Sequence, residues 1–443
     1  MKLHWMQAGL VGVACNAPAY SIAVTTWSLI AASGSASALA ILLSGLLMLG
    51  ILFAYARLNC SDPNCGAAYT WVSKLIHPVA GFVAGWCLIG ASILFMVSAA
   101  LPAGKATLLA IYPSLADNKV VVMCVAFGWL LFATTIVARG IQLAGRLQSV
   151  LTAIELGLVG LVLAAVIWSL DAASVSTILI NLTPSAGTEW RKVAAGVVIG
   201  VFFYWGWDVI FNLSEETRDT RVSSQRAGAV SLVLLIACFT AYAGATSHSV
   251  TERELRDAGD NVLIALANKL LPRPFSYLAL IAFLVSTVGA MQASLLQFSR
   301  TLFSIARDGV ISRELAVTPE GGESPRRAVM VDFVLVCLLL LITYFVSTIE
   351  EAVSSAIGAS GILVAIYYAL AACACVVYHL GKREKNTADI VFGIVFPCTS
   401  VCALAICAYA ASMEYSRLAS LMILGFMGLG LLVVFSRKLG ARS

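Results

Sequence analysis

The sequence predicts an all-α polytopic membrane protein, and its composition and its repeated apolar runs both support this fold class. Of the 443 residues, 60% are hydrophobic and 12% are charged, whereas an ordinary soluble protein has about 25% charged residues. Apolar runs of about the ~20 residues that a helix needs to cross a bilayer recur along the whole chain. The N-terminus shows no cleavage pattern, so we expect the first segment to remain as a span.

Hydropathy divides the chain into about 12 predicted transmembrane helices. The first six lie near 7–33, 36–57, 80–104, 120–138, 149–170 and 194–213, and the second six near 227–247, 275–305, 328–347, 353–378, 389–411 and 416–436. An even number of spans places both termini on one side of the membrane. Nine of the 28 Lys and Arg residues fall in loops on the opposite side, which leaves 19 on the side of the termini. The positive-inside rule therefore predicts cytoplasmic termini and a multi-pass protein of the cytoplasmic (inner) membrane.

The composition also excludes several function classes. Basic cytoplasmic loops account for the net charge of +5, so no nucleic-acid partner is needed. The four His residues fall in terminal or loop regions without metal-binding spacing, and most of the 12 Cys residues lie within spans. We therefore expect no cofactor, no metal and no enzymatic activity. A channel would place polar residues along an open path, whereas here they gather at one depth.

Two spans are interrupted at comparable places. The first break lies at Ala17-Pro18-Ala19 within "GVACNAPAYSIAV", and the second lies at Gly206 within "VFFYWGWDVIFNLSEE". A lone Pro or Gly in a transmembrane helix is most often a packing kink. These two spans, however, each begin a half of five spans, and paired breaks indicate the binding site of a secondary transporter. Freed N–H groups favour an anion and freed carbonyls a cation, so a zwitterionic amino acid matches both.

Four motifs resemble those of a known permease family. They are "NCGAAYTWVSKLIHPVAGFVAGW" after the second span, "GRLQSVLTAIEL" at the fifth, "FFYWGWDVIFNLSEETRD" at the sixth, and "SRTLFSIARDGVIS" with "SPRRAV" after the eighth. In this order they resemble the amino acid–polyamine–organocation (APC) superfamily. The resemblance implies a LeuT-like 5+5 inverted repeat with discontinuous helices 1 and 6. The repeats would occupy residues 1–175 and 176–385. Residues 386–443 would add spans 11 and 12 and the cytoplasmic C-terminus. Spans 11 and 12 could form the contacts of a homodimer, which stays an open alternative.

The resemblance implies a small-molecule substrate bound at both breaks. The implied substrate-binding residues are Asn16, Ala17, Pro18, Ala19, Tyr20, Ser21, Phe202, Phe203, Trp205, Gly206 and Trp207. In the family, the first break receives the substrate carboxylate through backbone N–H groups. Pro18 has no N–H to give, although Ala19, Tyr20 and Ser21 do. An amino acid is the predicted substrate, and a polyamine or an amino alcohol stays open as the alternative.

Glu155 stands where many sodium-independent family members carry a Lys. A charge at membrane depth is costly, and burial favours the neutral form of a carboxyl group, which suits a proton carrier. The alternative is a structural carboxyl that hydrogen-bonds the broken first helix, for instance at the Cys15 or Asn16 backbone. Ser286 and Thr287 match the place where relatives supply sodium-ligating hydroxyls, so a sodium-coupled symporter also stays open.

The remaining charged residues complete the predicted mechanism. Asp208 stands where the family commonly has Glu, and we expect it to hold the broken helix or to carry a proton. Arg300, Arg307 and Asp308 end the eighth span and are predicted to lock the cytoplasmic side when it is closed. The predicted function is secondary active transport by alternating access, coupled to protons or working by exchange.

Overall fold

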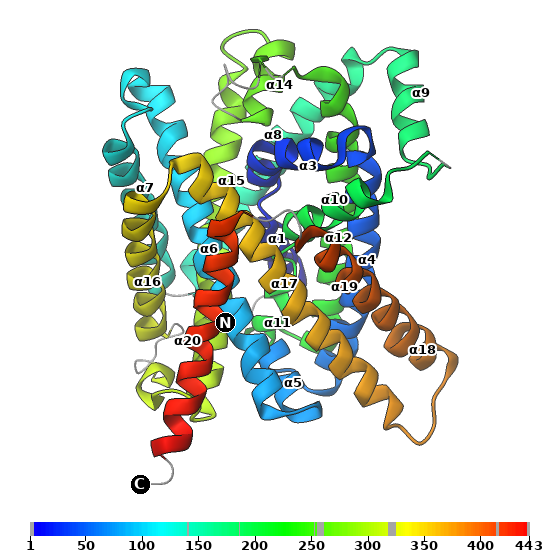
Figure 1. The fold of residues 1–443 in the computed structure, drawn as a ribbon, viewed down its shortest axis with the longest axis vertical. Helices are drawn as coiled ribbons and strands as arrows, with labels where there is room; N and C mark the ends of the chain where they lie inside the picture. The colour runs from blue at the N-terminus through cyan, green and yellow to red at the C-terminus, as the bar shows by residue number, and fades with distance from the viewer. Residues whose placement is uncertain are drawn as a thin grey trace.

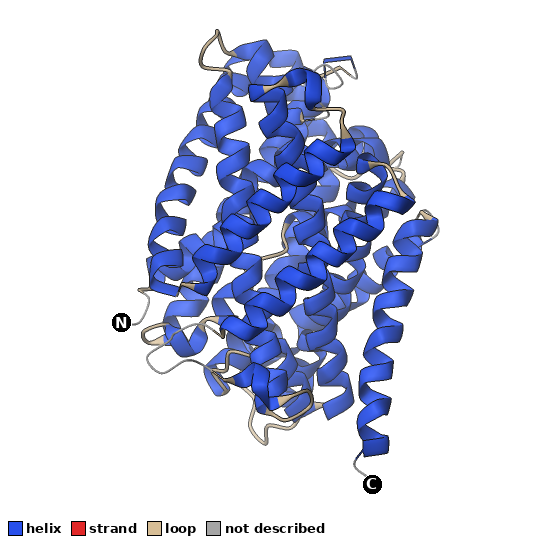
Figure 2. Ribbon diagram, turned by 90° about the vertical axis from the view of Figure 1, so that its left-hand side faces the viewer, coloured by secondary structure: helices blue, strands red, loops and turns tan. Residues whose placement is uncertain are grey.

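The computed structural model describes residues 4–139, 141–185, 187–251, 253–254, 261–317, 325–412 and 416–440, and every regular element in these ranges is helical (Figures 1 and 2). The long helices are α4 (Ser37–Ser61), α6 (Pro78–Ile111), α7 (Lys119–Ala138), α8 (Ile141–Ser169), α12 (Thr220–Ser249), α15 (Tyr277–Arg307), α16 (Arg326–Val346), α17 (Ile349–Leu380), α19 (Phe396–Ser412) and α20 (Arg417–Gly440). The shorter helices are α1 (Trp5–Asn16), α2 (Pro18–Tyr20), α3 (Thr26–Ser33), α5 (Ala68–Leu75), α9 (Ala172–Asn181), α10 (Trp190–Phe203), α11 (Val209–Asn212), α14 (Val262–Leu270) and α18 (Thr387–Ile390).

Nine helices within the described ranges are long and apolar enough to cross a membrane. The prediction of an all-α polytopic membrane protein is confirmed at this level. Two predicted spans, 7–33 and 36–57, lie within one of the nine, Trp5–Ser61, where the chain turns at Gly34 (φ 55°) between α3 and α4 (Figure 1). The sixth predicted span is divided between α10 and α11. The number of 12 spans and the inverted repeat therefore remain predictions.

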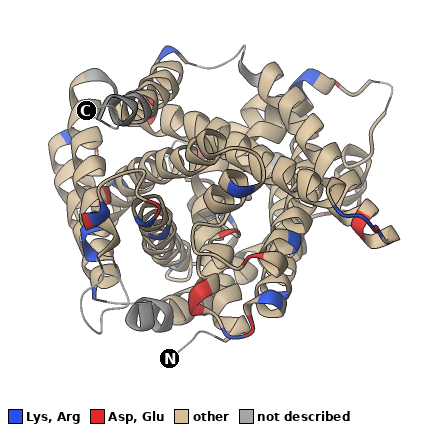
Figure 3. Cartoon of the chain, turned by 90° about the horizontal axis from the view of Figure 1, so that it is seen from below, with Lys and Arg blue, Asp and Glu red and all other residues tan. Residues whose placement is uncertain are grey.

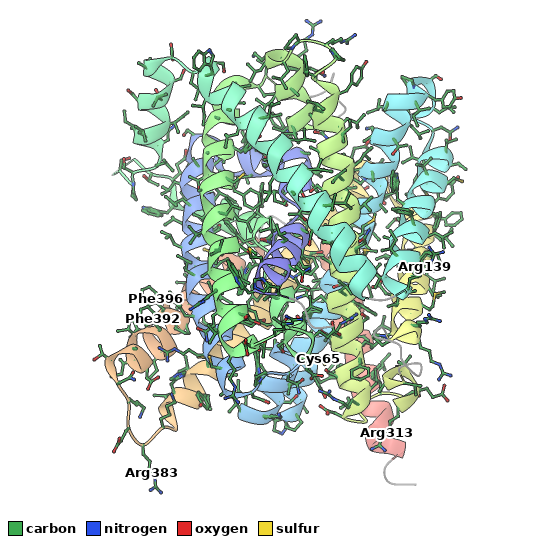
Figure 4. The ribbon with its side chains drawn as sticks, turned by 180° about the vertical axis from the view of Figure 1, so that it is seen from behind. Cys65, Arg139, Arg313, Arg383, Phe392 and Phe396 are labelled. Atoms are coloured by element: carbon green, nitrogen blue, oxygen red, sulfur yellow. The ribbon has the colours of Figure 1, made fainter. Side chains whose placement is uncertain are left out.

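The connecting segments gather at two ends of the molecule. Figure 1 places α9 and α14 at the upper end and α5 and α18 at the lower end. Arg313 and Arg383 also lie at the lower end (Figure 4). This arrangement agrees with the two sets of loops that the predicted spans define, and the lower end is the one predicted to be cytoplasmic.

The interrupted segments lie inside the helical bundle. α1 packs against α8, α12 and α15, and in Figure 4 α8 crosses in front of it. α10 packs closely on α3 and α4, where Ser33 Oγ donates to Lys192 O (3.3 Å) and Ser44 Oγ donates to Val197 O (3.0 Å). A Cβ on Gly196 would overlap Ser33 Oγ. Small residues permit this close approach of helices in a membrane.

Candidate functional site

The first break follows from the conformation of Ala17. This residue is left-handed (φ 47°, ψ 65°), so α1 ends at Asn16 and a second half begins at Pro18. The first position of a helix suits Pro because its missing N–H is not needed there. A π-helical turn, Ser21–Thr25, continues the second half into α3. All residues from Asn16 to Ala23 are buried, so their backbone polar groups need partners inside the protein.

The protein itself occupies the N–H groups at the start of the second half. Ala19 N donates to Glu155 Oε1 (3.0 Å), and Tyr20 N donates to Ser286 Oγ (3.1 Å). Ser21 N donates to Ala17 O (2.8 Å). These are the three groups expected to receive a substrate carboxylate, and each already has an acceptor.

Glu155 contacts the broken helix at a different place from the one expected. The structural alternative named the Cys15 or Asn16 backbone, but the Glu155 carboxylate accepts its hydrogen bond from Ala19. The physical reason is that N–H groups point out of the start of a helix, and a carboxylate is stabilised there. Glu155 is fully enclosed, with 1% of its surface exposed.

Only part of the predicted hydroxyl set reaches the break. Ser286 does, through Tyr20 N. The Thr287 hydroxyl instead donates to Phe283 O of its own helix (2.7 Å), and the Ser21 hydroxyl donates to Asn16 O (2.9 Å). Both hydroxyls therefore donate to carbonyls of their own segments, which leaves the lone pairs of their oxygens as acceptors.

The second break touches the first. α10 ends at Phe203, and Gly206 takes a φ of 118° that favours glycine. A Cβ at Gly206 would lie 2.6 Å from the backbone carbon of Cys15. Asn16 Nδ2 donates to Trp205 O across the same contact. Two segments 189 residues apart in sequence thus meet at their interruptions.

Asp208 follows the second break and is held by three side chains. Its Oδ2 accepts from Tyr367 OH (2.9 Å) and Gln297 Nε2 (2.8 Å), and its Oδ1 accepts from Tyr368 OH (2.9 Å). Trp205 Nε1 in turn donates to Tyr367 OH (2.7 Å). Asp208 has no exposed surface. Sequence reasoning missed these three partners, although polar residues within apolar spans gave a signal for each.

The predicted aromatic residues divide into two groups. The rings of Phe202 and Trp205 face Phe95 at centroid distances of 6.3 Å and 5.5 Å, and Tyr20 lies 5.6 Å from the same ring. Phe203 turns away and packs on Phe239 of α12 (5.2 Å). Trp207 also packs on other rings than Phe95: it stacks on Tyr368 (5.7 Å) and contacts Tyr55 (5.5 Å). Phe203 and Trp207 thus form the second group.

A cavity of about 230 Å³ lies on the upper side of the breaks. Its lining includes Trp27, Lys105, Asn261, Phe283 and Glu350. Lys105 Nζ and Glu350 Oε1 form an ion pair across it (3.3 Å). Phe283 also stacks on Tyr20, with centroids 6.2 Å apart, so this ring separates the cavity from the first break.

The lower side of the breaks is closed by ion pairs and hydrogen bonds. Arg300 Nη2 lies 3.1 Å from Glu216 Oε1, and Arg307 Nη1 lies 3.4 Å from Glu215 Oε1. Tyr69 OH donates to Asp308 Oδ2 (2.9 Å). Viewed from below, acidic and basic residues lie among the helix ends (Figure 3), and Cys65, whose N–H donates to Glu215 Oε1 (3.0 Å), lies near the lower centre (Figure 4). Arg300, Arg307 and Asp308 therefore all take part in links at this end.

The sequence matches the family profile described as "Amino acid permease" over residues 3–436. The chain belongs to the amino acid permease family. This match confirms the resemblance to the APC superfamily that the sequence motifs indicated. It also makes the chain a transport protein of the membrane, in agreement with its apolar helices.

Several characterised and uncharacterised transporters are similar to this permease. It is 28% identical over 185 residues to the low-affinity putrescine importer PlaP of Escherichia coli, a match that covers 41% of this chain and 40% of the relative. It is 24% identical over 284 residues to Asc-type amino acid transporter 1 of Homo sapiens, covering 62% of this chain and 52% of the relative. An uncharacterized transporter of Mycobacterium tuberculosis is 24% identical over 344 residues, 77% of this chain and 72% of that protein.

The permease spans about half or less of the length of the first two of these relatives. The family and these relatives are transporters rather than enzymes, which confirms the prediction that the chain is not an enzyme. The substrates in the names of the first two relatives differ, since one is the diamine putrescine and the other is an amino acid. Both kinds of substrate carry an amino group.

Proposed function

We propose that the permease is a secondary active transporter that moves a small amino compound across the cytoplasmic membrane by alternating access. The observation that carries the proposal is the direct contact of the two breaks, where Asn16 bonds Trp205 O and Gly206 lies against Cys15. Irregular backbone at membrane depth is tolerated only where it is enclosed by protein or lines a cavity. Paired breaks of this kind form the substrate sites of secondary transporters.

The proposal includes the finer architecture expected from the sequence. In it, 12 spans form two inverted repeats, residues 1–175 and 176–385, and residues 386–443 add the last two spans and the C-terminus. Both termini face the cytoplasm, so the lower end of Figure 1 is cytoplasmic. The substrate lies between Asn16–Ser21 on one side and Phe202–Trp207 on the other.

The two ends of the molecule support alternating access. The lower end is linked by the Arg300–Glu216 and Arg307–Glu215 pairs, while the upper end has a cavity above Phe283. In this state a solute approaches from the upper side. Release to the cytoplasm requires the lower ion pairs to separate. The solute can drive the change from this state to one open at the lower end only if it binds the two states with different affinities.

Glu155 is the proposed proton-coupling group. Its carboxylate accepts the Ala19 N–H, and a hydrogen bond to an ionised acceptor is roughly twice as strong as a neutral one. Protonation would therefore weaken the link between α8 and the second half of the broken helix. A sodium-coupled symporter stays the alternative, because the Thr287 hydroxyl donates only its hydrogen to its own helix and its oxygen can still ligate a cation.

The proposal is tested by uptake into proteoliposomes. We would compare wild type, Glu155→Gln and Glu314→Gln, with and without an inward proton gradient and with sodium or choline outside. Glu314 is a matched control because its side chain is 79% exposed in an ion pair with Arg327. We expect wild type and Glu314→Gln to accumulate an amino compound only with the gradient, and Glu155→Gln to exchange without accumulating it.

Two results would contradict parts of this proposal. Accumulation by Glu155→Gln equal to wild type would make Glu155 structural, and accumulation driven by sodium alone would replace the proton as the coupling ion. A third result would contradict the transport proposal as a whole. It is the absence of both uptake and counterflow for every amino compound, in a protein that thermal unfolding shows to be folded.

A further inference from the structure

A pocket of about 310 Å³ lies between the C-terminal end of α7 and the start of α16, away from the two breaks. The two helices are joined beside it, because Arg326 Nε donates to Ala138 O (3.1 Å). Arg139, which follows α7, lies at the flank of the molecule and nearer its middle than Arg313 does (Figure 4). The pocket is therefore at the edge of the membrane rather than in a loop.

Two arginines line this pocket without an acidic partner. Arg139 and Arg326 are both exposed, and the ion pairs found among the described residues include neither of them. The adjacent Arg327, by contrast, is paired with Glu314 (3.3 Å). Because Arg326 bonds Ala138 through Nε, its two terminal nitrogens remain as donors. Guanidinium groups of this kind bind phosphate in a bidentate way.

The rest of the pocket suits a hydrocarbon chain rather than a polar solute. Its wall includes Leu131, which is 55% exposed, Met330, which is 48% exposed, and Phe333. α7 and α16 are both candidate membrane spans, so these side chains face lipid. The wall also holds Thr134 and Thr135, but each hydroxyl donates to a carbonyl of its own helix (2.7 Å). The wall threonines therefore offer no hydrogen to a ligand.

We propose that this pocket binds an anionic phospholipid of the membrane. The lipid phosphate lies between the Arg139 and Arg326 guanidinium groups, and an acyl chain follows Leu131, Met330 and Phe333. Charge complementarity identifies the occupant, since basic pockets between transmembrane helices on the cytoplasmic side recognise anionic headgroups. The two arginines at one end and the apolar wall at the other match the order of headgroup and chain. This site goes beyond the proposed transport function and does not depend on the identity of the solute.

The test measures the affinity of the purified full-length protein for two lipids that differ only in headgroup charge. Native mass spectrometry and thermal unfolding in detergent would compare dioleoyl phosphatidylglycerol with dioleoyl phosphatidylcholine. We expect wild type to bind the anionic lipid at least tenfold more tightly, and its unfolding temperature to rise with the concentration of that lipid alone, because a ligand that binds only the folded protein stabilises it.

A double variant of the pocket is compared with a matched double variant outside it. Arg139→Ala with Arg326→Ala removes both headgroup contacts, whereas Arg313→Ala with Arg383→Ala removes the same charge from exposed residues of the lower end that do not line the pocket. A basic residue near an anionic headgroup contributes about fivefold in affinity. We therefore expect the pocket variant to bind phosphatidylglycerol about thirtyfold more weakly than wild type, and the control to stay within twofold.

Four results would overturn the proposal. Equal losses in the two double variants would mean that only the total charge attracts the lipid, and equal affinity for the two lipids would mean that the headgroup is not recognised. An equal rise in unfolding temperature with glycerol 3-phosphate would indicate a site for free phosphate. A dimer in phosphatidylcholine nanodiscs that the pocket variant converts to a monomer would show that a second copy covers the pocket.

A single variant keeps the proposal testable if the pocket variant does not fold because Ala138 O loses its donor. Arg139→Ala removes one headgroup contact and leaves that bond in place. We expect it to weaken phosphatidylglycerol binding about fivefold. Unchanged binding in the folded Arg139→Ala protein would contradict the role given to this residue and with it the two-arginine site.

Discussion

The two breaks in the permease are stabilised in different ways. At the first break, backbone N–H groups are bonded by side chains from other helices, Glu155 and Ser286. At the second break, the chain supplies its own carboxylate, Asp208, and hydroxyl and amide groups of α15 and α17 hold it. Both acceptors are carboxyl groups, but Glu155 reaches the first break from another helix, whereas Asp208 belongs to the second break and is held by three side-chain donors. The comparison teaches that the first break suits a switch and the second suits an anchor.

The largest effect is expected for Gly206→Ala at the second break. A φ of 118° is strained for any residue with a Cβ, and the new atom would lie 2.6 Å from the Cys15 backbone. Backbone strain and overpacking each cost about 1–3 kcal/mol, so we expect a loss of about 2–6 kcal/mol and of most transport. Thermal unfolding in detergent and counterflow would measure both.

Gly128→Ala is the matched control for this change. Gly128 lies within α7, and a Cβ there meets nothing within 4 Å, so we expect no loss and a gain of up to about 1 kcal/mol from helix propensity. Equal stability of the two variants would show that the breaks do not touch.

The next effect separates the two tyrosines that hold Asp208. Tyr367→Phe removes a bond to Asp208 and leaves Trp205 Nε1 without its acceptor, whereas Tyr368→Phe removes one bond only. A hydrogen bond to a charged group contributes about 1.5–3 kcal/mol, and an unsatisfied buried donor costs about 1–3 kcal/mol. We therefore expect Tyr367→Phe to destabilise the protein more, by about 1–3 kcal/mol. The reverse order in thermal unfolding would mean that the Trp205 bond is not formed.

A smaller effect is expected for Ser286→Ala at the first break. It leaves Tyr20 N without an acceptor, which costs about 1–3 kcal/mol. Thr287→Ala is the control one residue away, and because its hydroxyl bonds only its own helix we expect less than about 0.5 kcal/mol. If the two variants unfold at the same temperature, Ser286 does not hold the first break.

The smallest effect is expected for Ala17→Gly. Ala17 holds a left-handed conformation, which costs a residue with a Cβ about 1–2 kcal/mol. Glycine removes that cost but loses more entropy on folding, by about 0.5–1 kcal/mol. We expect a gain in stability of up to about 1 kcal/mol with transport within twofold of wild type. A clear loss of stability would mean that the first break needs a side chain at this position.

The positions of the breaks could be predicted from the sequence, while their contacts could not. Pro18 and Gly206 disrupt a helix by their own chemistry, so local sequence is enough to locate both interruptions. The link of Tyr367 and Tyr368 to Asp208 joins residues 159 and 160 positions apart, and it depends on how α17 packs. The sequence also could not distinguish Phe202, which lies near Phe95, from Phe203, which packs on Phe239, because that difference depends on how α10 packs on its neighbours.

For Glu155, the sequence predicted the burial of the side chain but not the backbone group that it contacts. Its burial and its contact with the broken helix followed from the cost of a charge at membrane depth. The choice of Ala19 as its partner depended on which N–H groups the left-handed Ala17 turns toward α8. A one-residue difference in the turn would have changed which N–H groups remained free.

The close contacts of α10 with α3 and α4 have a consequence for how the permease can move. Ser33 and Ser44 lie on the bare backbone at Gly196 and Gly200 and bond two carbonyls of α10. α10 cannot slide along α3 and α4 without breaking these two bonds, so we expect the three helices to move together. α11 is bonded to other segments, through Asp208 at its start and through Asn212 Nδ2, which donates to Cys65 O (2.9 Å). In the transport cycle that we propose, rotation about residues 204–208 would move α11 relative to α10, and the second break would be its pivot.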